Sequence, residues 1–157
     1  MGNANNIAEL EARLANVEAR LGVRELLDRY NDAVNQRDVD AWAACWTDDA
    51  VWNIPIMPGQ NEVVGKKAIV DSWVRSMKVY PVLIMLAHIG KIELRGEGEA
   101  WVRSYHNELG RYVDGREIRP RGQYEDIMVK QNGEWLFKHR TFDAIYGENP
   151  EDVKYVD

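Results

Sequence analysis

The sequence predicts an α+β domain, in which helices of the first half pack against one face of an antiparallel sheet built by the second half. Before residue 78, apolar residues recur at steps of three and four, the spacing of amphipathic helices. From residue 82 onward, β-branched and aromatic residues alternate with polar ones between glycine-containing breaks, which is typical of strands. The 157 residues suit one domain, which we place over 1–157 because no internal linker interrupts them.

The N-terminal segment predicts two consecutive helices. Residues 6–21 carry a heptad-like apolar stripe and are expected to form an arm that packs on a partner or on the chain's own domain. Gly22 weakens the helix at that point, and 22–36 is the expected first core helix. The stripe of the arm consists of Ile7, Leu10, Leu14, Val17 and Leu21.

Two shorter helices and a loop are expected next. Asp38 is a plausible N-cap for a helix that carries Trp42 and Trp46 at helical spacing and ends at Asp48-Asp49. A short strand over 50–54 follows. The Pro- and Gly-containing loop over 55–64 is long enough to cover a site, and a third helix is expected over 66–77.

The remaining core, which extends to residue 146, predicts four strands and their turns. The strands are expected over 82–94, 99–112, 116–130 and 135–146, with a tail over 147–157. The breaks fall at Gly96, at Asp114-Gly115 and at Asn132-Gly133, and the last of these is a strong hairpin signal.

Composition excludes several classes of function. The chain has 20 Lys and Arg against 26 Asp and Glu, a net charge of −6 that disfavours nucleic-acid binding. A single cysteine, Cys45, allows no internal disulfide and fits a reducing, cytoplasmic compartment. No apolar run reaches the roughly 18 residues of a membrane span. With one cysteine and three histidines, no metal site is expected.

Familiar phosphate-loop, zinc-protease and serine-hydrolase motifs are missing from the sequence. No GxGxxG, GxxxxGK[ST], HExxH or GxSxG occurs, so no cofactor is expected. Side chains alone then limit the chemistry to acid/base reactions, namely elimination, hydration, isomerisation, cyclisation or retro-aldol cleavage.

His88 is the first candidate for such chemistry. Counting alternate residues along 82–94 puts it on a face that is otherwise apolar or glycine. It is either a core imidazole bonded to backbone or a general base in an apolar pocket.

The next strand brings two more candidates onto one face. His106 and Glu108 follow the small side chains of Ala100 and Ser104, which indicates a cavity that becomes polar toward one end. The alternative is that both residues lie near a strand end and meet solvent.

Helix and loop positions supply the remaining candidates. Tyr30 lies on the apolar stripe of the first core helix, as ordinary core or as a hydroxyl that needs a partner. Asn35 is a site residue or a helix cap. The expected substrate-binding set, in which the arginines would hold an anionic or carbonyl oxygen unless they are paired surface residues, is Trp52, Glu108, Arg121, Tyr124 and Arg140.

The order of these parts resembles the SnoaL-like branch of the nuclear-transport-factor-2-like superfamily. That branch includes polyketide cyclases, scytalone dehydratase, hexachlorocyclohexane dehydrochlorinase and bile acid dehydratase. The segments that carry the resemblance are RELLDRYNDAVNQRDVDAWAACWTDDAVW (24–52), LAHIGKIEL (86–94), GEAWVRSYHNEL (98–109) and GQYEDIMVKQNGEWLFKHR (122–140).

The resemblance implies a cone-shaped, curved antiparallel sheet wrapped around N-terminal helices and enclosing a hydrophobic pocket. It also implies that His88 is the base and that Tyr30 contacts the substrate. Asn35 occupies the place of an aspartate, and its amide orients an imidazole without stabilising the protonated form. Glu108 lies nearest to the acidic residue of the bile acid enzyme, and His106 has no clear counterpart.

The expected function is that of a cofactor-independent lyase, dehydratase, isomerase or cyclase acting on a hydrophobic oxygenated ring compound. In this account His88 takes a proton, Tyr30 or His106 donates one, and Asn35 holds the imidazole. The alternative is a non-catalytic small-molecule binding or subunit-assembly module, since a fold does not fix a function. A homo-oligomer is expected, a trimer before a dimer, with no nucleic-acid or membrane partner.

Overall fold

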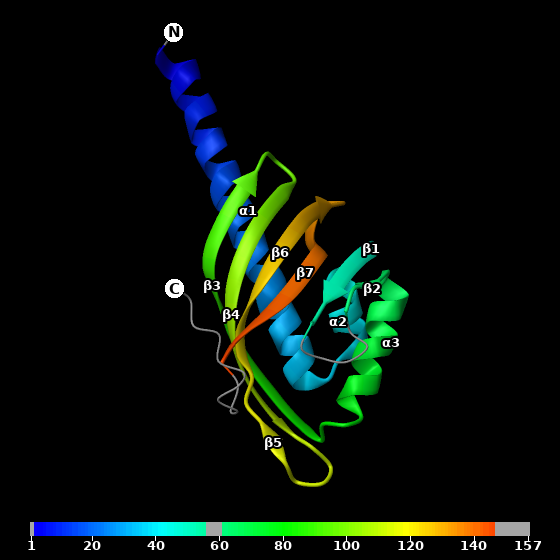
Figure 1. The fold of residues 1–157 in the computed structure, drawn as a ribbon. Coiled ribbons are helices and arrows are strands. Elements are labelled where there is room, and N and C mark those ends of the chain that lie inside the picture. Colours follow the sequence, from blue (N-terminus) through cyan, green and yellow to red (C-terminus); the bar gives the residue numbers. More distant parts are fainter. Residues whose placement is uncertain (1, 56–60, 147–157) are drawn as a thin grey trace.

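A curved seven-stranded sheet wraps around one long helix in the computed structural model, which describes residues 2–55 and 61–146 (Figure 1). Helix α1 (Gly2–Gln36) runs behind the sheet, and α2 (Val39–Ala44) and α3 (Lys66–Met77) lie beside its β1–β2 end. The predicted α+β class is confirmed. Part of the predicted covering loop, 56–60, and the tail over 147–157 lie outside the described residues.

The predicted arm and first core helix form one uninterrupted helix, so the expected weakening at Gly22 is wrong. A Cβ at this position would lie 2.5 Å from Trp135 Cδ1. Glycine therefore lets the helix pass close to the Trp135 indole, and the packing gained there offsets the low helix propensity of glycine. Because the helix is continuous, the part of α1 that packs in the core also sets the direction in which the side chains of the arm point.

Helix α2 begins as predicted and ends earlier than predicted. The Asp38 carboxylate accepts a hydrogen bond from Ala41 N at 2.9 Å, which confirms the N-cap. Trp46 does not continue the helix, since it pairs with Phe137 at the start of strand β1 (Trp46–Asn53). The spacing of Trp42 and Trp46 thus indicated a shared core and not a shared helix.

The sheet has the order β2-β1-β7-β6-β4-β3, and β5 pairs with β4. One pair, β1 with β7, is parallel, whereas the sequence predicted antiparallel pairing throughout. The predicted strand over 116–130 is divided into β5 and β6, with Pro120 between them, because proline has no N–H for a ladder. The strands not yet delimited are β2 (Val63–Val64), β3 (Val82–Arg95), β4 (Glu99–Arg111), β5 (Glu117–Ile118), β6 (Arg121–Gln131) and β7 (Glu134–Tyr146).

An aromatic cluster lies in the buried core. Its rings contact one another at centroid distances from 4.7 to 6.1 Å, and the closest pair, Trp42 and Trp73, is stacked. Such rings bury a large apolar area each and dominate the hydrophobic stabilisation of a core. The cluster consists of Tyr30, Trp42, Trp46, Trp52, Trp73 and Phe137.

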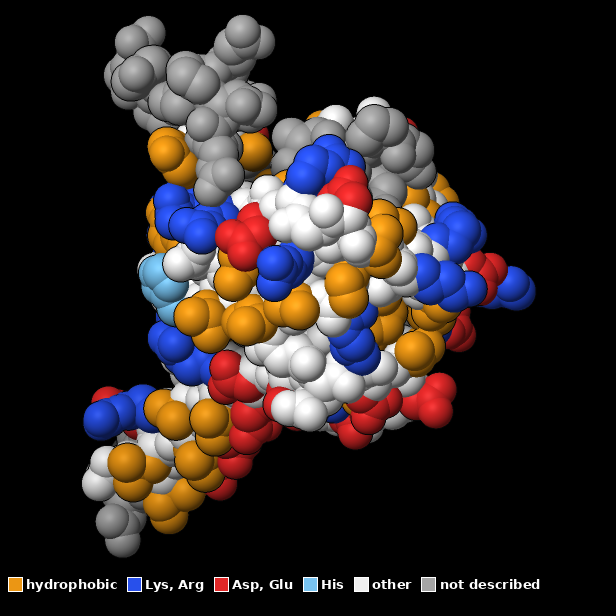
Figure 2. Space-filling view, turned by 90° about the horizontal axis from the view of Figure 1, so that it is seen from below, with side chains coloured by type: hydrophobic (Ala, Val, Ile, Leu, Met, Phe, Trp, Pro, Cys, Tyr) orange, Lys and Arg blue, Asp and Glu red, His pale blue; other side chains and the backbone are white. Residues whose placement is uncertain are grey.

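The N-terminal end of α1 projects beyond the sheet (Figure 1). The five apolar residues of the predicted stripe are 54–61% exposed there, and Figure 2 shows hydrophobic side chains gathered on this projecting part of the surface. Of the two expected locations for the stripe, packing on the chain's own domain is therefore wrong. None of the helices in the described part of the chain is both long enough and apolar enough to cross a membrane.

Candidate active site

A group of polar side chains is buried on the inner face of the sheet, opposite α1. Strand β4 contributes Ser104 and His106, strand β6 contributes Asp126, and strand β7 contributes Arg140. All four are at most 3% exposed. Most buried polar groups in proteins are hydrogen-bonded, so the mutual contacts of these four side chains indicate what the site can do.

Arg140 is the centre of this group. Its Nη1 lies 3.1 Å from Asp126 Oδ2, and its Nη2 lies 3.2 Å from His106 Nε2. The guanidinium carbon is 3.8 Å from the ring centroid of Tyr124 and 4.4 Å from that of Tyr30. These contacts place a permanent positive charge inside the domain, held by one carboxylate and by aromatic faces.

His106 is a neutral imidazole in this setting. Burial, the Arg140 charge and, to a lesser extent, His88 lower the pKa of His106 to about 2. Because a guanidinium only donates, Nε2 must carry the lone pair that accepts from Arg140, and Ser104 Oγ lies 3.0 Å from the same nitrogen. The proton then resides on Nδ1, which lies 3.4 Å from Met85 Sδ.

Two carboxyl groups in the site have strongly raised pKa values. Burial raises the pKa of Glu108 to about 7 against the opposing effect of Arg140. Burial likewise raises the pKa of Asp126 to about 7, although Arg140 is its ion-pair partner. Asp126 Oδ1 is buried without a hydrogen-bond partner, which leaves half of this carboxylate unsatisfied.

Glu108 differs from Asp126 in its access to solvent. It is half-buried, and its carboxylate has no hydrogen bond or ion pair with any residue that the structure describes. Its charge raises the pKa of both Tyr30 and Tyr124, so it shares their surroundings. An acid that titrates near neutrality and remains accessible is suited to proton transfer.

Tyr30 and Tyr124 supply hydroxyl groups that stay protonated. Burial raises the pKa of Tyr30 to about 12 and that of Tyr124 well above its ordinary value. Both side chains are at most 4% exposed. Together with Arg140, these hydroxyls can stabilise negative charge, and all three groups interact electrostatically with Glu108.

His88 does not belong to this site, and its predicted place on the inner face is wrong. A β-bulge between Ile89 and Lys91 shifts the alternation of β3 at Gly90. Before the bulge the odd-numbered residues face the interior, so His88 is exposed and lies against Tyr105 at 5.5 Å between ring centroids. Counting a single alternation through Gly90 therefore assigned His88 to the wrong face.

Asn35 also lies away from the predicted contact. Its Nδ2 donates to Met85 O at 2.9 Å, and its Oδ1 accepts from Met85 N at 2.8 Å. Strand β3 is the last in the sheet order, and the amide pairs with the backbone at this open edge as a neighbouring strand would. Asn35 thus fixes the end of α1 to β3 and does not orient His88.

The remaining predicted residues divide between the site and its surroundings. Tyr124 and Arg140 lie in the site. Trp52 is buried in the aromatic cluster at 5.5 Å from Trp42. Arg121 is exposed, where its Nε donates to Asn107 Oδ1 at 3.4 Å, so the alternative of a paired surface arginine is the correct one.

Asp126 was missed by the sequence reasoning, although the sequence contains a signal for it. Tyr124, Asp126 and Met128 alternate along β6, and all three are buried. An acidic residue between two large core residues at period two indicates a buried carboxylate that needs a cation on a neighbouring strand. Arg140 is that cation, since it is the direct register partner of Asp126.

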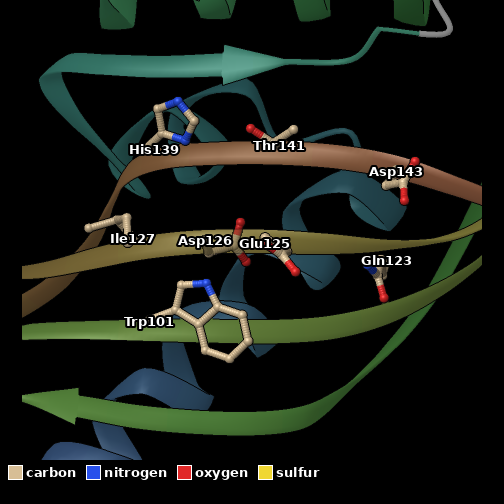
Figure 3. A pocket seen from close by; sticks show the side chains of 8 residues that line it. All are labelled: Trp101, Gln123, Glu125, Asp126, Ile127, His139, Thr141 and Asp143. Carbon is tan, nitrogen blue, oxygen red and sulfur yellow. The ribbon is translucent and has the colours of Figure 1, made fainter.

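A separate open groove of about 440 Å³ crosses β4, β6 and β7. Figure 3 shows the side chains that line it, among them the third histidine, His139, and Trp101. Within residues 2–55 and 61–146, no three His, Cys, Asp or Glu side chains are grouped so that they could hold a metal ion. The full lining is Trp101, Gln123, Glu125, Asp126, Ile127, His139, Thr141 and Asp143.

Several solved structures have the same architecture as this chain. A protein of Novosphingobium aromaticivorans DSM 12444, provisionally described as a scytalone dehydratase, is 21% identical, with a TM-score of 0.77 over 91% of this chain and 92% of that chain. The type 2 hexachlorocyclohexane dehydrochlorinase LinA is 18% identical, with a TM-score of 0.78 over 92% and 97%. A ketosteroid isomerase-like protein of Erwinia carotovora atroseptica SCRI1043 is 21% identical, with a TM-score of 0.68 over 78% and 93%.

These identities establish a shared fold. Comparison with curated protein sequences gave no significant match. The family model of the SnoaL-like domain matches residues 15–141, which is most of the chain. The chain therefore belongs to the SnoaL-like domain family and has its NTF2-like fold.

Proposed function

We propose that this protein is a cofactor-independent acid/base enzyme, a lyase or isomerase, that acts on a hydrophobic ring compound bearing a carbonyl or hydroxyl oxygen. The observation that carries the proposal is a half-buried carboxyl, Glu108, on the inner face of β4, whose pKa burial raises to about 7 although it feels the charge of the buried Arg140. A general base works best when its pKa lies near the working pH. The structural neighbours named as dehydratase, dehydrochlorinase and isomerase-like support the same class of chemistry.

In this proposal Glu108, and not His88, is the proton acceptor. The exposed position of His88 separates it from Tyr30 and Arg140. His106 is a poor base, because its lowered pKa leaves little affinity for a proton. Its role is to hold the guanidinium of Arg140 through Nε2 while remaining neutral.

The chemical step follows from these roles. The Glu108 carboxylate takes a proton from the carbon next to a ring carbonyl, and the electron pair moves onto the carbonyl oxygen. The field of Arg140 and the hydroxyls of Tyr30 and Tyr124 stabilise the resulting enolate. The enolate then expels a β-hydroxyl, which leaves as water with the proton from Glu108, or it is protonated again at another carbon, which completes an isomerisation.

The environment of the site supports an apolar ring as the substrate. Tyr30 lies in the aromatic cluster, and partly buried apolar side chains of β3 pack against the same core. A hydrophobic site strengthens each charge interaction made by Glu108 and Arg140. Those partly buried side chains include Leu83, Ala87 and Ile89.

The proposal is tested with a panel of hydrophobic cyclic β-hydroxyketones, followed by the ultraviolet absorbance of the enone that dehydration produces. Glu108→Gln should lower turnover by about 10²–10⁴-fold, the usual range for one general base. Glu97→Gln is the matched control, since Glu97 is exposed in the turn between β3 and β4, and it should retain wild-type turnover. Equal turnover in both variants would contradict the role of Glu108. Binding of the panel without any turnover would favour the alternative of a non-catalytic binding module.

A further inference from the structure

The apolar stripe of the arm lies on the side of α1 that faces away from the domain. At 3.6 residues per turn, the stripe residues and the core residues of the same helix point about 180° apart. The core residues are buried, whereas the stripe residues are 54–61% exposed. The core residues in question are Val23, Leu26, Leu27 and Tyr30.

The position of the stripe on the side of α1 opposite to the core residues determines what it can contact. Because α1 is one continuous helix, the arm cannot turn its stripe toward the chain's own sheet. Two arms that met along their stripes would carry their domains on the outer sides of the helix pair, where the domains do not collide. The surface is therefore available to a second helix and unsuited to the chain's own sheet.

The stripe has the spacing of a coiled-coil seam. In a heptad that begins with Ile7 at position a, Leu14 and Leu21 also occupy a, while Leu10 and Val17 occupy d. Apolar residues that recur only at a and d form a narrow stripe, which suits packing against one other helix. A helix that packs on a sheet needs a wider apolar face.

Charged residues flank the seam with one sign on each side. The e positions carry Glu11 and Glu18, and the g positions carry Arg13 and Arg20. In a parallel pair, a g residue faces the e residue five positions later on the other helix, so Arg13 of one copy faces Glu18 of the other. An antiparallel pair would place Arg against Arg and Glu against Glu.

We propose that the occupant of this surface is the arm of a second copy of the same chain, and that the arms associate as a parallel coiled coil. Self-complementary charges at e and g favour an identical partner, and their arrangement specifies the parallel orientation. Assembly weakens with salt, because salt screens the exposed Arg–Glu pairs. The inference is independent of the proposed enzymatic activity.

Sedimentation velocity of the full chain at micromolar concentration and low salt is the first test. The wild-type protein should sediment as an assembly, and Leu14→Asp should sediment as a monomer with an unchanged circular dichroism spectrum. Ala12→Glu is the matched control, because it adds the same charge to an exposed position of the arm outside the seam. A monomeric wild-type protein, or an assembly that survives Leu14→Asp, would overturn the proposal.

Charge exchange tests the orientation. Arg13→Glu and Glu18→Arg should each weaken assembly, and mixing the two variant chains should restore it, because both cross-pairs then join opposite charges. A Leu10→Cys chain should also form an intermolecular disulfide under mild oxidation, since equal d positions meet only in the parallel arrangement. The single natural cysteine, Cys45, is buried and does not compete. Failure of the mixture to assemble, or the absence of the disulfide, would contradict the parallel coiled coil.

Discussion

Arg140 and Asp126 form an ion pair in which neither side chain is exposed to solvent, with 3.1 Å between Nη1 and Oδ2. The two residues are register partners on β7 and β6, so the pairing of the strands sets their distance. The pair fixes the guanidinium beside His106 and the rings of Tyr30 and Tyr124. A buried ion pair of this kind contributes little net stability to the fold. Its role in the proposed function is to hold the positive charge of Arg140 inside the candidate site.

Removal of one partner of this pair should be costly. Arg140→Met leaves the Asp126 carboxyl buried without its cation and should lower the free energy of unfolding by about 3–5 kcal/mol. The loss should be smaller below pH 7, where Asp126 can take up a proton. Urea denaturation at two pH values measures both effects, and Arg121→Met, at an exposed position, should change stability by less than about 0.5 kcal/mol. A loss as small as that of the control would show that Arg140 does not hold Asp126.

The stability of the protein should fall as pH rises through the acidic range. In the unfolded chain, Glu108 and Asp126 release their protons near their ordinary pKa values of 4.5 and 3.8, whereas the folded protein holds them to about pH 7. Between these limits the folded state binds more protons, so an increase in pH favours unfolding. Glu108→Gln should flatten this slope and raise the melting temperature above pH 7. Melting curves recorded from pH 4 to pH 8 would contradict the account if wild type and variant ran in parallel.

His88 should be dispensable. It is exposed on the outer face of β3, so His88→Ala should change the free energy of unfolding by less than about 0.5 kcal/mol and leave turnover nearly unchanged. Denaturation and the enone assay measure the two quantities. Loss of turnover by about 10²-fold or more would restore His88 as a base and overturn its exclusion from the site.

Replacement of Asn35 by aspartate should lower the stability of the protein. The carboxylate cannot donate to Met85 O, and it would place a negative charge against that carbonyl, so Asn35→Asp should cost about 1 kcal/mol. Gln36→Glu introduces the same charge at the neighbouring exposed position and serves as the control. If chemical denaturation gives equal stabilities for both variants, the amide does not fix α1 to β3.

Local signals predicted much of the fold. The Asn132-Gly133 turn has the positive φ values of 51° and 88° that its residues favour, and helix α3 has the predicted bounds. Alternation also put Ser104 and His106 on the inner face of β4 correctly, because the pairing of this strand with β6 runs without a register shift from Glu99 to Asn107. These features depend on residues close together in sequence.

The errors arose where distant parts of the chain decide the structure. Trp46 joins a parallel pair with Phe137, a contact that no local pattern contains. Gly90 was a visible signal of a bulge, yet only the pairing with β4 shows that the alternation shifts there and turns His88 outward. The pairing of Asp126 with Arg140 could not be counted back from the hairpin turn. A register shift between Ile127 and Met128 moves the partner of Asp126 from His139 to Arg140.

Direct titration of the Glu108 side chain tests whether this carboxyl is prepared for proton transfer. Carbon-13 NMR of the glutamate carboxyl carbons, with Glu108 assigned from the Glu108→Gln spectrum, gives its pKa without knowledge of the substrate. We expect a midpoint of about 7, set by burial against the charge of Arg140, and a higher midpoint in Arg140→Met. A midpoint at the ordinary value of 4.5 would show that Glu108 is not prepared for proton transfer and would contradict the proposed activity.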